Sequence, residues 1–207
     1  MVHYKLTYFV GRGYGEPARL MFRYAGIEFE DVRLEFDDWI KIKDTTPFGQ
    51  IPILEVDGVV IAQSFAITRL VAKASGLYPE NNVDAALADS IADYIKEIDL
   101  KGFLNYFGTK AGFLTGDTDK FLEEEVKPTI NSTFPIITKW LKEAGNGYLT
   151  KSGLTFADFF AAEKLGNVVT HFDKTAAEWP EITQFVNRIY SLPNVKEYVA
   201  SRPKRLF

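Results

Sequence analysis

Residues 47–64 constrain the fold of this chain more than any other segment. The β-branched and apolar run Ile53–Val56 suits a strand, and a returning strand is expected at residues 59–62. Between them, Asp57-Gly58 favours a tight turn, because glycine readily adopts the positive φ that such turns need. Ser64 stands at a helix N-cap position, ahead of apolar residues at helical spacing. The segment therefore predicts a β-hairpin that leads directly into a helix.

The peptide bond before the hairpin, Ile51-Pro52, can adopt the cis form, since X-Pro bonds do so at low free-energy cost. A cis-proline turns backbone N–H and C=O groups outward, where an extended peptide can pair with them. The N-terminus of the following helix attracts a carboxylate. Together these features indicate a site for a small anionic peptide.

Composition narrows the class of protein. The 207 residues suffice for one large or two small domains, and 46% apolar residues suit a globular protein with a sizeable core. A net charge of −4 gives no broad basic surface, so we expect no nucleic-acid partner. The sequence shows no secretory signal and no apolar run of membrane-spanning length, which favours a cytoplasmic protein without a membrane partner.

The chain contains no cysteine. Disulfides and thiol–disulfide exchange through a protein sulfur are therefore excluded, and any reactive sulfur must belong to a ligand. The two histidines, His3 and His171, are far apart in the sequence and lack neighbouring ligands, so we expect no metal site.

Strands and helices alternate in the first part of the chain. Besides the hairpin, the pattern predicts strands at 5–9 and 28–33 and helices at 16–25, 37–44 and 64–75. This order, βαβ, a helix, then ββα, is that of a thioredoxin-like domain, which we place at residues 1–78. Turn-forming residues 76–82 mark a linker.

The rest of the chain, residues 84–207, is predicted to be all-helical. Apolar residues keep roughly helical spacing from Leu87 to Leu104. A second long helix is expected at residues 121–144, where Pro128 and Pro135 should kink or break it.

Further along, Thr155 and Asp158 have the spacing of a capping box at the start of a helix. Another helix should open at Trp179-Pro180 and end near Pro193, with a last short one at residues 194–201. The C-terminal part is therefore expected to be a helical domain joined to a thioredoxin-like one.

Several motifs resemble those of a known family. The motifs that match the glutathione-binding segment of cytosolic glutathione transferases are Gln50-Ile51-Pro52, Glu55-Val56-Asp57-Gly58 and Gln63-Ser64. Motifs similar to the sigma class, and closest to its roundworm branch, are Tyr4–Phe9, Asp38-Trp39 and Pro47-Phe48-Gly49. Residues 154–158 resemble the capping motif of the second domain. The resemblance covers nearly the whole chain and implies an α/β thioredoxin-like domain followed by an all-α domain, with glutathione as co-substrate and no metal.

Tyr8 is the main candidate for catalysis. It lies near the end of the first predicted strand, just before residues 11–13, so its side chain can reach a site facing the hairpin. A phenol O–H donated to a sulfur lowers the thiol pKa, and the thiolate is the nucleophile. The alternative is a strand tyrosine packed in the core; the family resemblance favours the catalytic role.

The resemblance also implies which residues bind glutathione. Ser64 can hold the γ-glutamyl carboxylate with its hydroxyl and backbone N–H, and can cap the helix as well. Lys43 suits the carboxylate of the glycine end, although many lysines are only solvated surface charges. The expected set is Tyr8, Trp39, Lys43, Gly49, Gln50, Ile51, Pro52, Gln63 and Ser64, with Glu97 from a partner subunit.

A homodimer is expected from charge. Asp89, Asp93 and Glu97 are four residues apart on one helix, and like charges at this spacing destabilise it unless cations face them. Arg69 is a candidate cation. By family resemblance, Glu97, or Asp93 as second choice, would complete the partner's glutathione site. A merely solvated acidic face is the alternative.

The second substrate is expected to be a small apolar electrophile, conjugated in detoxification. Its pocket should draw on Phe9, Val10, Tyr14, Phe103, Tyr106, Phe107, Leu206 and Phe207, although some of these aromatic residues must belong to the core. Vertebrate sigma enzymes that isomerise prostaglandins typically carry Arg at the position of Tyr14 and Trp at that of Leu104, which argues against prostaglandin synthesis here. Val10 stands where a polar residue is common and makes this side more apolar.

Two other functions fit the same fold. One is a noncatalytic carrier of haem or other flat apolar ligands. Negligible turnover despite glutathione binding would favour this function. The other is a structural protein like those of the lens. The joint presence of Tyr8, Lys43, Gln63 and Ser64 argues against the structural role.

Overall fold

The computed structural model describes residues 2–205, which divide into two compact units. The first unit combines residues 2–78 with Leu192–Arg205, and the second spans Pro79–Ser191. Among the described residues, no helix is both long and apolar enough to cross a membrane.

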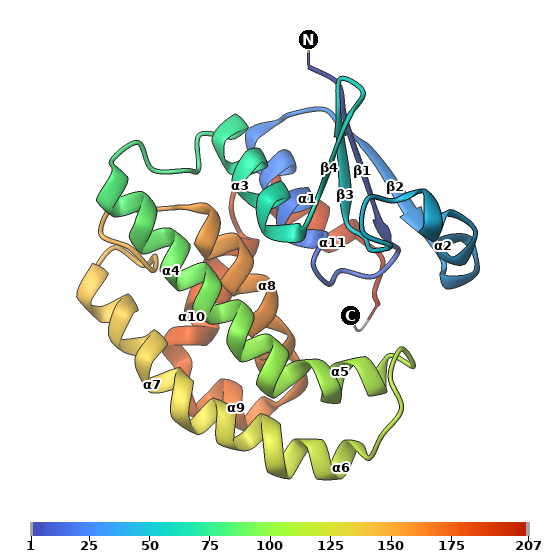
Figure 1. The fold of residues 1–207 in the computed structure, drawn as a ribbon. Coiled ribbons are helices and arrows are strands. Elements are labelled where there is room, and N and C mark those ends of the chain that lie inside the picture. Colours follow the sequence, from blue (N-terminus) through green and yellow to red (C-terminus); the bar gives the residue numbers. More distant parts are fainter. Residues whose placement is uncertain (1, 206–207) are drawn as a thin grey trace. The chain divides into compact units, whose positions relative to one another are not determined.

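A four-stranded mixed sheet forms the centre of the first unit, in the order β2-β1-β3-β4 (Figure 1). Its strands are β1 (Tyr4–Phe9), β2 (Glu30–Leu34), β3 (Ile53–Val56) and β4 (Val59–Ala62). β1 runs parallel to β2 and antiparallel to β3, and β3 and β4 form the predicted hairpin around the turn at Asp57-Gly58. Both turn residues have positive φ, as the tight turn requires.

Helices cover the sheet of the first unit. They are α1 (Glu16–Ala25), α2 (Phe36–Ile42) with a 3₁₀ turn (Lys43–Thr45), α3 (Ser64–Ala74) and α11 (Val195–Ser201). α1 packs against α3 and α11, and α2 lies on the other side of the sheet, next to β2 (Figure 1). The predicted thioredoxin-like order of elements is confirmed. The terminal helix α11 belongs to this unit, and the division into domains at residues 1–78 and 84–207 stays a prediction.

Local predictions in the first unit hold with small shifts. The Ile51-Pro52 bond is cis, as expected. The expected N-cap at Ser64 is wrong by one residue: Gln63 is the N-cap, and Ser64 is the first residue of α3. The helix expected at 37–44 ends at Ile42 and continues as a 3₁₀ turn.

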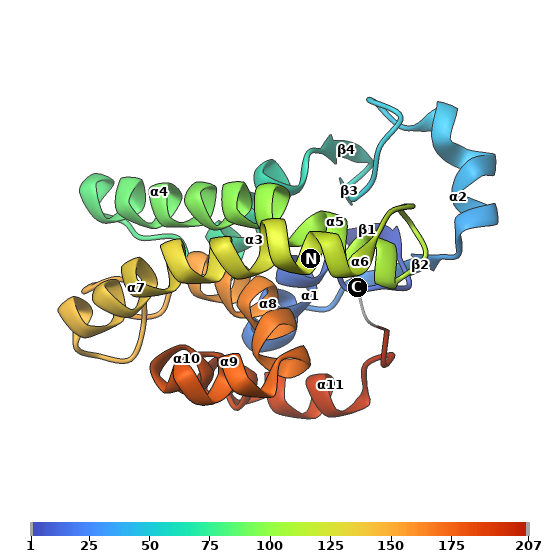
Figure 2. The same cartoon turned by 90° about the horizontal axis from the view of Figure 1, so that it is seen from below.

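The second unit is helical. Its elements are α4 (Asn82–Ile98), a π-helical turn (Asp99–Phe103), α5 (Leu104–Lys110), α6 (Thr118–Phe121), a second π-helical turn (Leu122–Val126), α7 (Lys127–Ala144), α8 (Phe156–His171), α9 (Asp173–Glu178) and α10 (Pro180–Tyr190). α8 is buried along most of its length because it lies between α4 and α10 (Figures 1 and 2). Its small and aromatic residues let these neighbours pack closely on it.

The two prolines of the long helix behave differently. Pro128 occupies the first turn of α7, directly after a π-helical turn, where the missing N–H is harmless. Pro135 lies inside α7, which continues through it, so of the expected kink or break the break is wrong and the kink stays a prediction. Both Pro135 and Asn131, whose carbonyl lacks an intrahelical donor, are exposed, and water can satisfy that carbonyl.

The capping box at the start of α8 is confirmed. Asp158 Oδ2 accepts the Thr155 N–H at 2.8 Å, and Oδ1 accepts the Leu149 N–H at 2.8 Å. Asp158 is fully buried, and this burial raises its pKa to about 6 even though the N–H donors favour the carboxylate. The helix start is therefore closed by the protein's own groups.

Candidate functional site

Tyr8 lies at the end of β1, with only 7% of its surface exposed. A glycine-rich turn wraps its ring: a Cβ added at Gly15 would lie 2.6 Å from the ring carbons, and one added at Gly13 would collide with the Tyr8 hydroxyl. Gly13 also has a positive φ of 39°. The turn between β1 and α1 thus needs glycine at both positions to hold Tyr8 where it is.

The hydroxyl of Tyr8 has a backbone donor. The N–H of Tyr14 donates to Tyr8 Oη at 3.1 Å. Since this bond occupies one lone pair of the phenol oxygen and polarises its O–H, the hydroxyl becomes a better donor to a further acceptor. Such a group can stabilise a thiolate.

Gln63 has the most unusual backbone of the site. Its φ of 74° and ψ of 117° lie outside the regions that non-glycine residues favour, which costs about 1–3 kcal/mol. Its side-chain Nε2 donates to Gln50 Oε1 at 3.3 Å. This bond brings the start of α3 next to the segment that carries the cis bond before the buried Pro52. Strain of this kind typically gathers at ligand sites.

The start of α3 is open to a ligand. Within residues 2–205 the Ser64 hydroxyl has no hydrogen-bond partner, and no side chain caps the helix. Only the Ser64 carbonyl is used, by the Thr68 hydroxyl at 2.7 Å. A helix of this length with free N–H groups and a free hydroxyl at its first turn can accept a carboxylate.

Comparisons with known proteins agree on one family. A family model described as "Glutathione S-transferase, N-terminal domain" matches residues 4–73, and one described as "Glutathione S-transferase, C-terminal domain" matches residues 110–202. Glutathione S-transferase 1 of Ascaris suum is 38% identical over 204 residues, covering 99% of this chain and 98% of that protein. The chain belongs to the glutathione S-transferase family.

Two solved glutathione S-transferases share the fold over their full length. Monomeric Na-GST-3 of the human hookworm Necator americanus is 40% identical, with a TM-score of 0.91 and coverage of 99% of this chain and 100% of that one. A Nu-class enzyme of Haemonchus contortus is also 40% identical, with a TM-score of 0.88 and full coverage of both chains. The predicted fold class is confirmed, and the protein is a transferase whose N-terminal domain implies glutathione binding.

In this transferase, the residues expected at the glycine end of glutathione share one region of the first unit. Trp39 is 7% exposed, and its ring meets that of Phe9 edge-on at 6.2 Å. Lys43 is exposed in the 3₁₀ turn, with no ion-pair partner among the described residues. Its Cε lies 3.7 Å from the position that a Cβ on Gly49 would take, so Lys43 and Gly49 are neighbours.

Other expected residues fall in different parts of the transferase. Glu97 lies on α4 in the second unit, where it pairs with Lys101. The expected pocket residues Phe9, Val10 and Tyr14 belong to the first unit, and Leu206 and Phe207 lie outside the described residues.

Two of the expected pocket residues of the second unit, Tyr106 and Phe107, belong to an aromatic cluster. Tyr106 lies 5.4 Å from Phe172, and Phe107 lies 5.3 Å from the His171 ring. Phe103 and Phe107 are fully buried. Among residues 2–205, no three potential ligands form a metal site.

Sequence reasoning missed the residues that hold Tyr8. Gly13 and Gly15 were not among the expected site residues, and Tyr14 was expected only in the electrophile pocket, although glycines at 11, 13 and 15 directly after a strand are a visible signal. Glu16 and Arg19, a charged pair buried on α1, were also missed.

Proposed function

We propose that Tyr8 activates the thiol of glutathione and that this transferase conjugates the thiolate to small apolar electrophiles. The observation that carries the proposal is the phenol of Tyr8, whose oxygen accepts the Tyr14 N–H and whose ring lies against a turn with no room for a side chain at Gly13 or Gly15. One hydrogen bond from this phenol to sulfur favours the thiolate. Holding both reactants side by side contributes the rest of the rate gain.

The first unit offers groups for each end of glutathione. Ser64 and Gln63, at the open start of α3, suit the γ-glutamyl carboxylate. The backbone at Gln50, Ile51 and the cis-Pro52 suits the cysteinyl part, which would pair as an extended peptide. Trp39, Lys43 and Gly49 suit the glycine end. No metal takes part in the proposed reaction.

The test replaces the phenol. Tyr8→Phe should lower kcat/KM with glutathione and a generic aromatic electrophile by roughly tenfold to a hundredfold, since a hydrogen bond to a charged acceptor is worth about 1.5–3 kcal/mol. Glutathione affinity should stay nearly unchanged, and the pKa of bound glutathione should rise. Tyr4→Phe, on the same strand with its ring against Phe22, is the matched control.

Two outcomes of this test would overturn the proposal. Wild-type turnover in Tyr8→Phe would remove Tyr8 from catalysis. Glutathione binding with negligible turnover in the unmodified protein would favour a carrier of haem or other apolar ligands instead.

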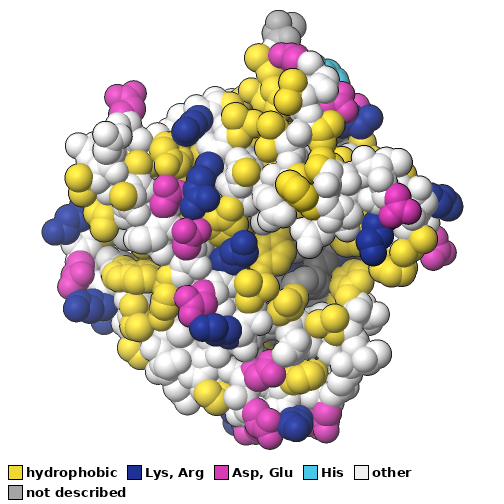
Figure 3. Space-filling view, viewed as in Figure 1, with side chains coloured by type: hydrophobic (Ala, Val, Ile, Leu, Met, Phe, Trp, Pro, Cys, Tyr) yellow, Lys and Arg dark blue, Asp and Glu magenta, His cyan; other side chains and the backbone are white. Residues whose placement is uncertain are grey.

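We also propose a cytoplasmic homodimer of the sigma class. Residues similar to that class support the assignment, although one solved relative is a Nu-class enzyme. Exposed apolar side chains support an interface: Val59 and Val60 on β4, where hydrophobic side chains gather on the surface (Figure 3), and, in the second unit, Val83 and Leu87 on α4. In the dimer, Glu97, or Asp93, would reach the partner's glutathione.

The related Na-GST-3 is a monomer, so the oligomeric state needs its own test. Sedimentation at micromolar concentration should give a dimer. Glu97→Gln should weaken glutathione binding without dissociating the dimer. Added salt should weaken glutathione binding to the unmodified protein by part of the same amount. A fully active monomer would refute the shared site.

A further inference from the structure

The last described helix, α11, contributes to a charge cluster near Tyr8 that is buried at its centre, at Glu16 and Arg19. We call it the Glu16 cluster; its members are Glu16, Arg19, Asp31, Arg33, Tyr198 and Arg202. Glu16 is fully buried, and its Oε1 accepts the Tyr198 hydroxyl at 2.9 Å and Arg202 Nη1 at 2.8 Å. Its Oε2 accepts Arg19 Nη1 at 3.2 Å. Tyr198 of α11 and Arg202, which directly follows this helix, thus hold the Glu16 carboxylate of α1.

The arginines of the cluster clamp the backbone that follows Tyr8. Arg19 donates to the carbonyls of Phe9 and Gly11, each at 3.0 Å, and Arg33 donates to the Val10 carbonyl at 3.4 Å. Three consecutive carbonyls therefore accept guanidinium N–H groups.

The two guanidinium groups are themselves held in place. Asp31 accepts the Nε of both Arg19 and Arg33 at 2.9 Å, and Arg33 Nη2 donates to the Tyr198 hydroxyl at 3.0 Å. Because a guanidinium is a rigid planar fork, its position fixes the carbonyls it bonds.

The clamped segment determines where the Tyr8 phenol lies. Phe9–Gly11 joins Tyr8 to the turn whose Gly13 and Gly15 contact the ring and whose Tyr14 N–H holds the hydroxyl. The Arg19 guanidinium also lies 5.9 Å from the centre of the Tyr8 ring. A shift of the Arg19 and Arg33 guanidinium groups would move Phe9–Gly11. The glycine turn and the Tyr14 N–H, which both contact the phenol, would then move as well.

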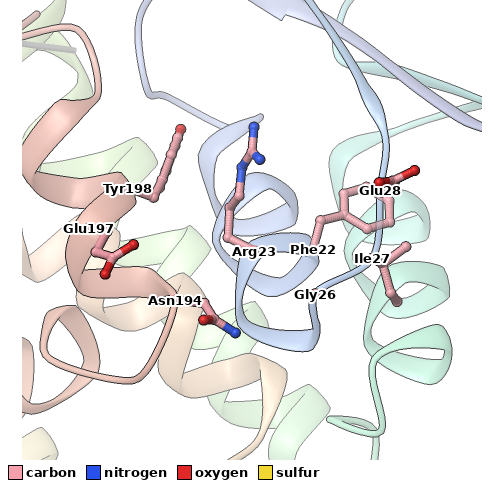
Figure 4. A pocket seen from close by; sticks show the side chains of 8 residues that line it. All are labelled: Phe22, Arg23, Gly26, Ile27, Glu28, Asn194, Glu197 and Tyr198. Atoms are coloured by element: carbon pink, nitrogen blue, oxygen red, sulfur yellow. The ribbon is translucent and has the colours of Figure 1, made fainter.

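Tyr198 stays a donor in this arrangement. Its burial, and the neighbouring Glu16 carboxylate, raise the pKa of its phenol, so the hydroxyl is protonated at neutral pH. The ring is fixed from the other side by Arg23 of α1, whose guanidinium carbon lies 5.6 Å from its centre. Figure 4 shows α11 beside α1, where Tyr198, Glu197 and Arg23 line a pocket of about 350 Å³.

We propose that Tyr198 and Arg202 are positioning residues for Tyr8: both hold Glu16, which bonds Arg19, and Tyr198 also bonds Arg33 directly, so together they keep the two guanidinium groups on the strand end and the phenol in its thiol-activating place. The inference rests on the proposed function of Tyr8. In this proposal, α11 affects thiol activation by Tyr8 although it does not contact glutathione.

The test removes the Tyr198 hydroxyl. In Tyr198→Phe, kcat/KM should fall about three- to tenfold, because small displacements of a catalytic group lower the rate strongly. The thiol pKa of bound glutathione, followed by thiolate absorbance, should rise by about half a unit to one unit, which is the differential stabilisation that a three- to tenfold rate loss represents. The KM for glutathione should change less than twofold.

Arg202→Met provides a second variant in case Tyr198→Phe folds poorly. It removes one of three donors to Glu16 from a residue near the surface, where the side chain is 9% exposed. We expect the same direction of change, and Arg202→Lys should recover part of the loss because it keeps the charge.

Tyr190→Phe is the matched control. The Tyr190 hydroxyl likewise bonds a buried glutamate, Glu163, at 2.9 Å, but in the second unit. Its loss should lower stability similarly and leave the thiol pKa unchanged. Glu197→Gln, on α11 itself, controls for a change of charge on the same helix.

The outcomes separate the two proposals. If Tyr8→Phe raises the thiol pKa but Tyr198→Phe and Arg202→Met do not, the positioning role is overturned and the proposed function stands. If Tyr190→Phe raises the thiol pKa as much as Tyr198→Phe, the effect is general destabilisation, and the inference also fails. If Tyr8→Phe leaves the thiol pKa unchanged, the proposed function fails first.

Discussion

The two units of this transferase begin a helix in opposite ways. In the second unit, α8 starts with a capping box in which Asp158 accepts the N–H groups of Thr155 and Leu149. In the first unit, α3 starts after the strained Gln63, no side chain caps it, and the Ser64 hydroxyl has no partner among residues 2–205. The closed start contributes stability, whereas the open one gives up stability and keeps its donors available for a ligand.

The largest effect is expected from opening the closed start. Asp158→Ala leaves two buried N–H groups without an acceptor, and each unsatisfied group costs about 1–3 kcal/mol. The free energy of unfolding in urea, measured near pH 5, should fall by about 3 kcal/mol. The folded fraction should keep its kcat/KM, because Asp158 lies in the second unit, outside the proposed glutathione site. A loss of activity without a loss of stability would contradict this division of roles.

The pKa of Asp158 predicts how its contribution changes with pH. Burial raises the folded-state pKa from 3.8 to about 6, so between these values the folded state binds a proton that the unfolded state has lost. The contribution of Asp158 to stability should therefore be fully present below pH 4 and be lost as pH rises through 6, by up to about 3 kcal/mol. Asp158→Asn cannot titrate, so the difference between wild type and this variant isolates the effect. A difference that grows with pH would show that the hydrogen bonds outweigh burial.

A second pair of sites sharpens the comparison, because each unit has a glycine pressed against a tyrosine. A Cβ on Gly15 would lie 2.6 Å from the Tyr8 ring, and one on Gly166 would lie 2.7 Å from the Tyr190 hydroxyl. Gly15→Ala should displace the phenol and lower kcat/KM about tenfold to a hundredfold. Gly166→Ala should lower stability only. Equal activity losses in the two variants would mean that crowding acts through general destabilisation.

The same contrast explains what the sequence could predict. The hairpin, the bounds of α1 and the capping box depend on residues close in sequence, and all three were predicted. The positive φ of Gln63 was missed, since no local preference of glutamine favours it and only tertiary packing sustains it.

Long-range contacts were missed for a related reason. The bonds from Tyr198 and Arg202 to Glu16 join residues 182 and 186 positions apart. Neither periodicity nor a motif marks such partners. One sign of these contacts was visible in the sequence: Glu16 and Arg19 stand among apolar residues of α1. Charged side chains that are buried in this way need ionic or hydrogen-bonding partners in the interior.

The smallest effect is expected at the open helix start, where Ser64→Ala removes a hydroxyl that bonds no described residue. Because that hydroxyl does not cap α3, the free energy of unfolding should change by less than about 0.5 kcal/mol, unlike the loss at Asp158. The KM for glutathione should rise about three- to tenfold with little change in kcat, since the γ-glutamyl end is held equally in the ground and transition states. Ser75→Ala removes a buried hydroxyl at the far end of the same helix that has no partner among residues 2–205, so it should leave the KM unchanged and should not lower the free energy of unfolding. If Ser64→Ala instead lowered stability and left KM unchanged, Ser64 would be a structural cap, and the difference between the two helix starts would disappear.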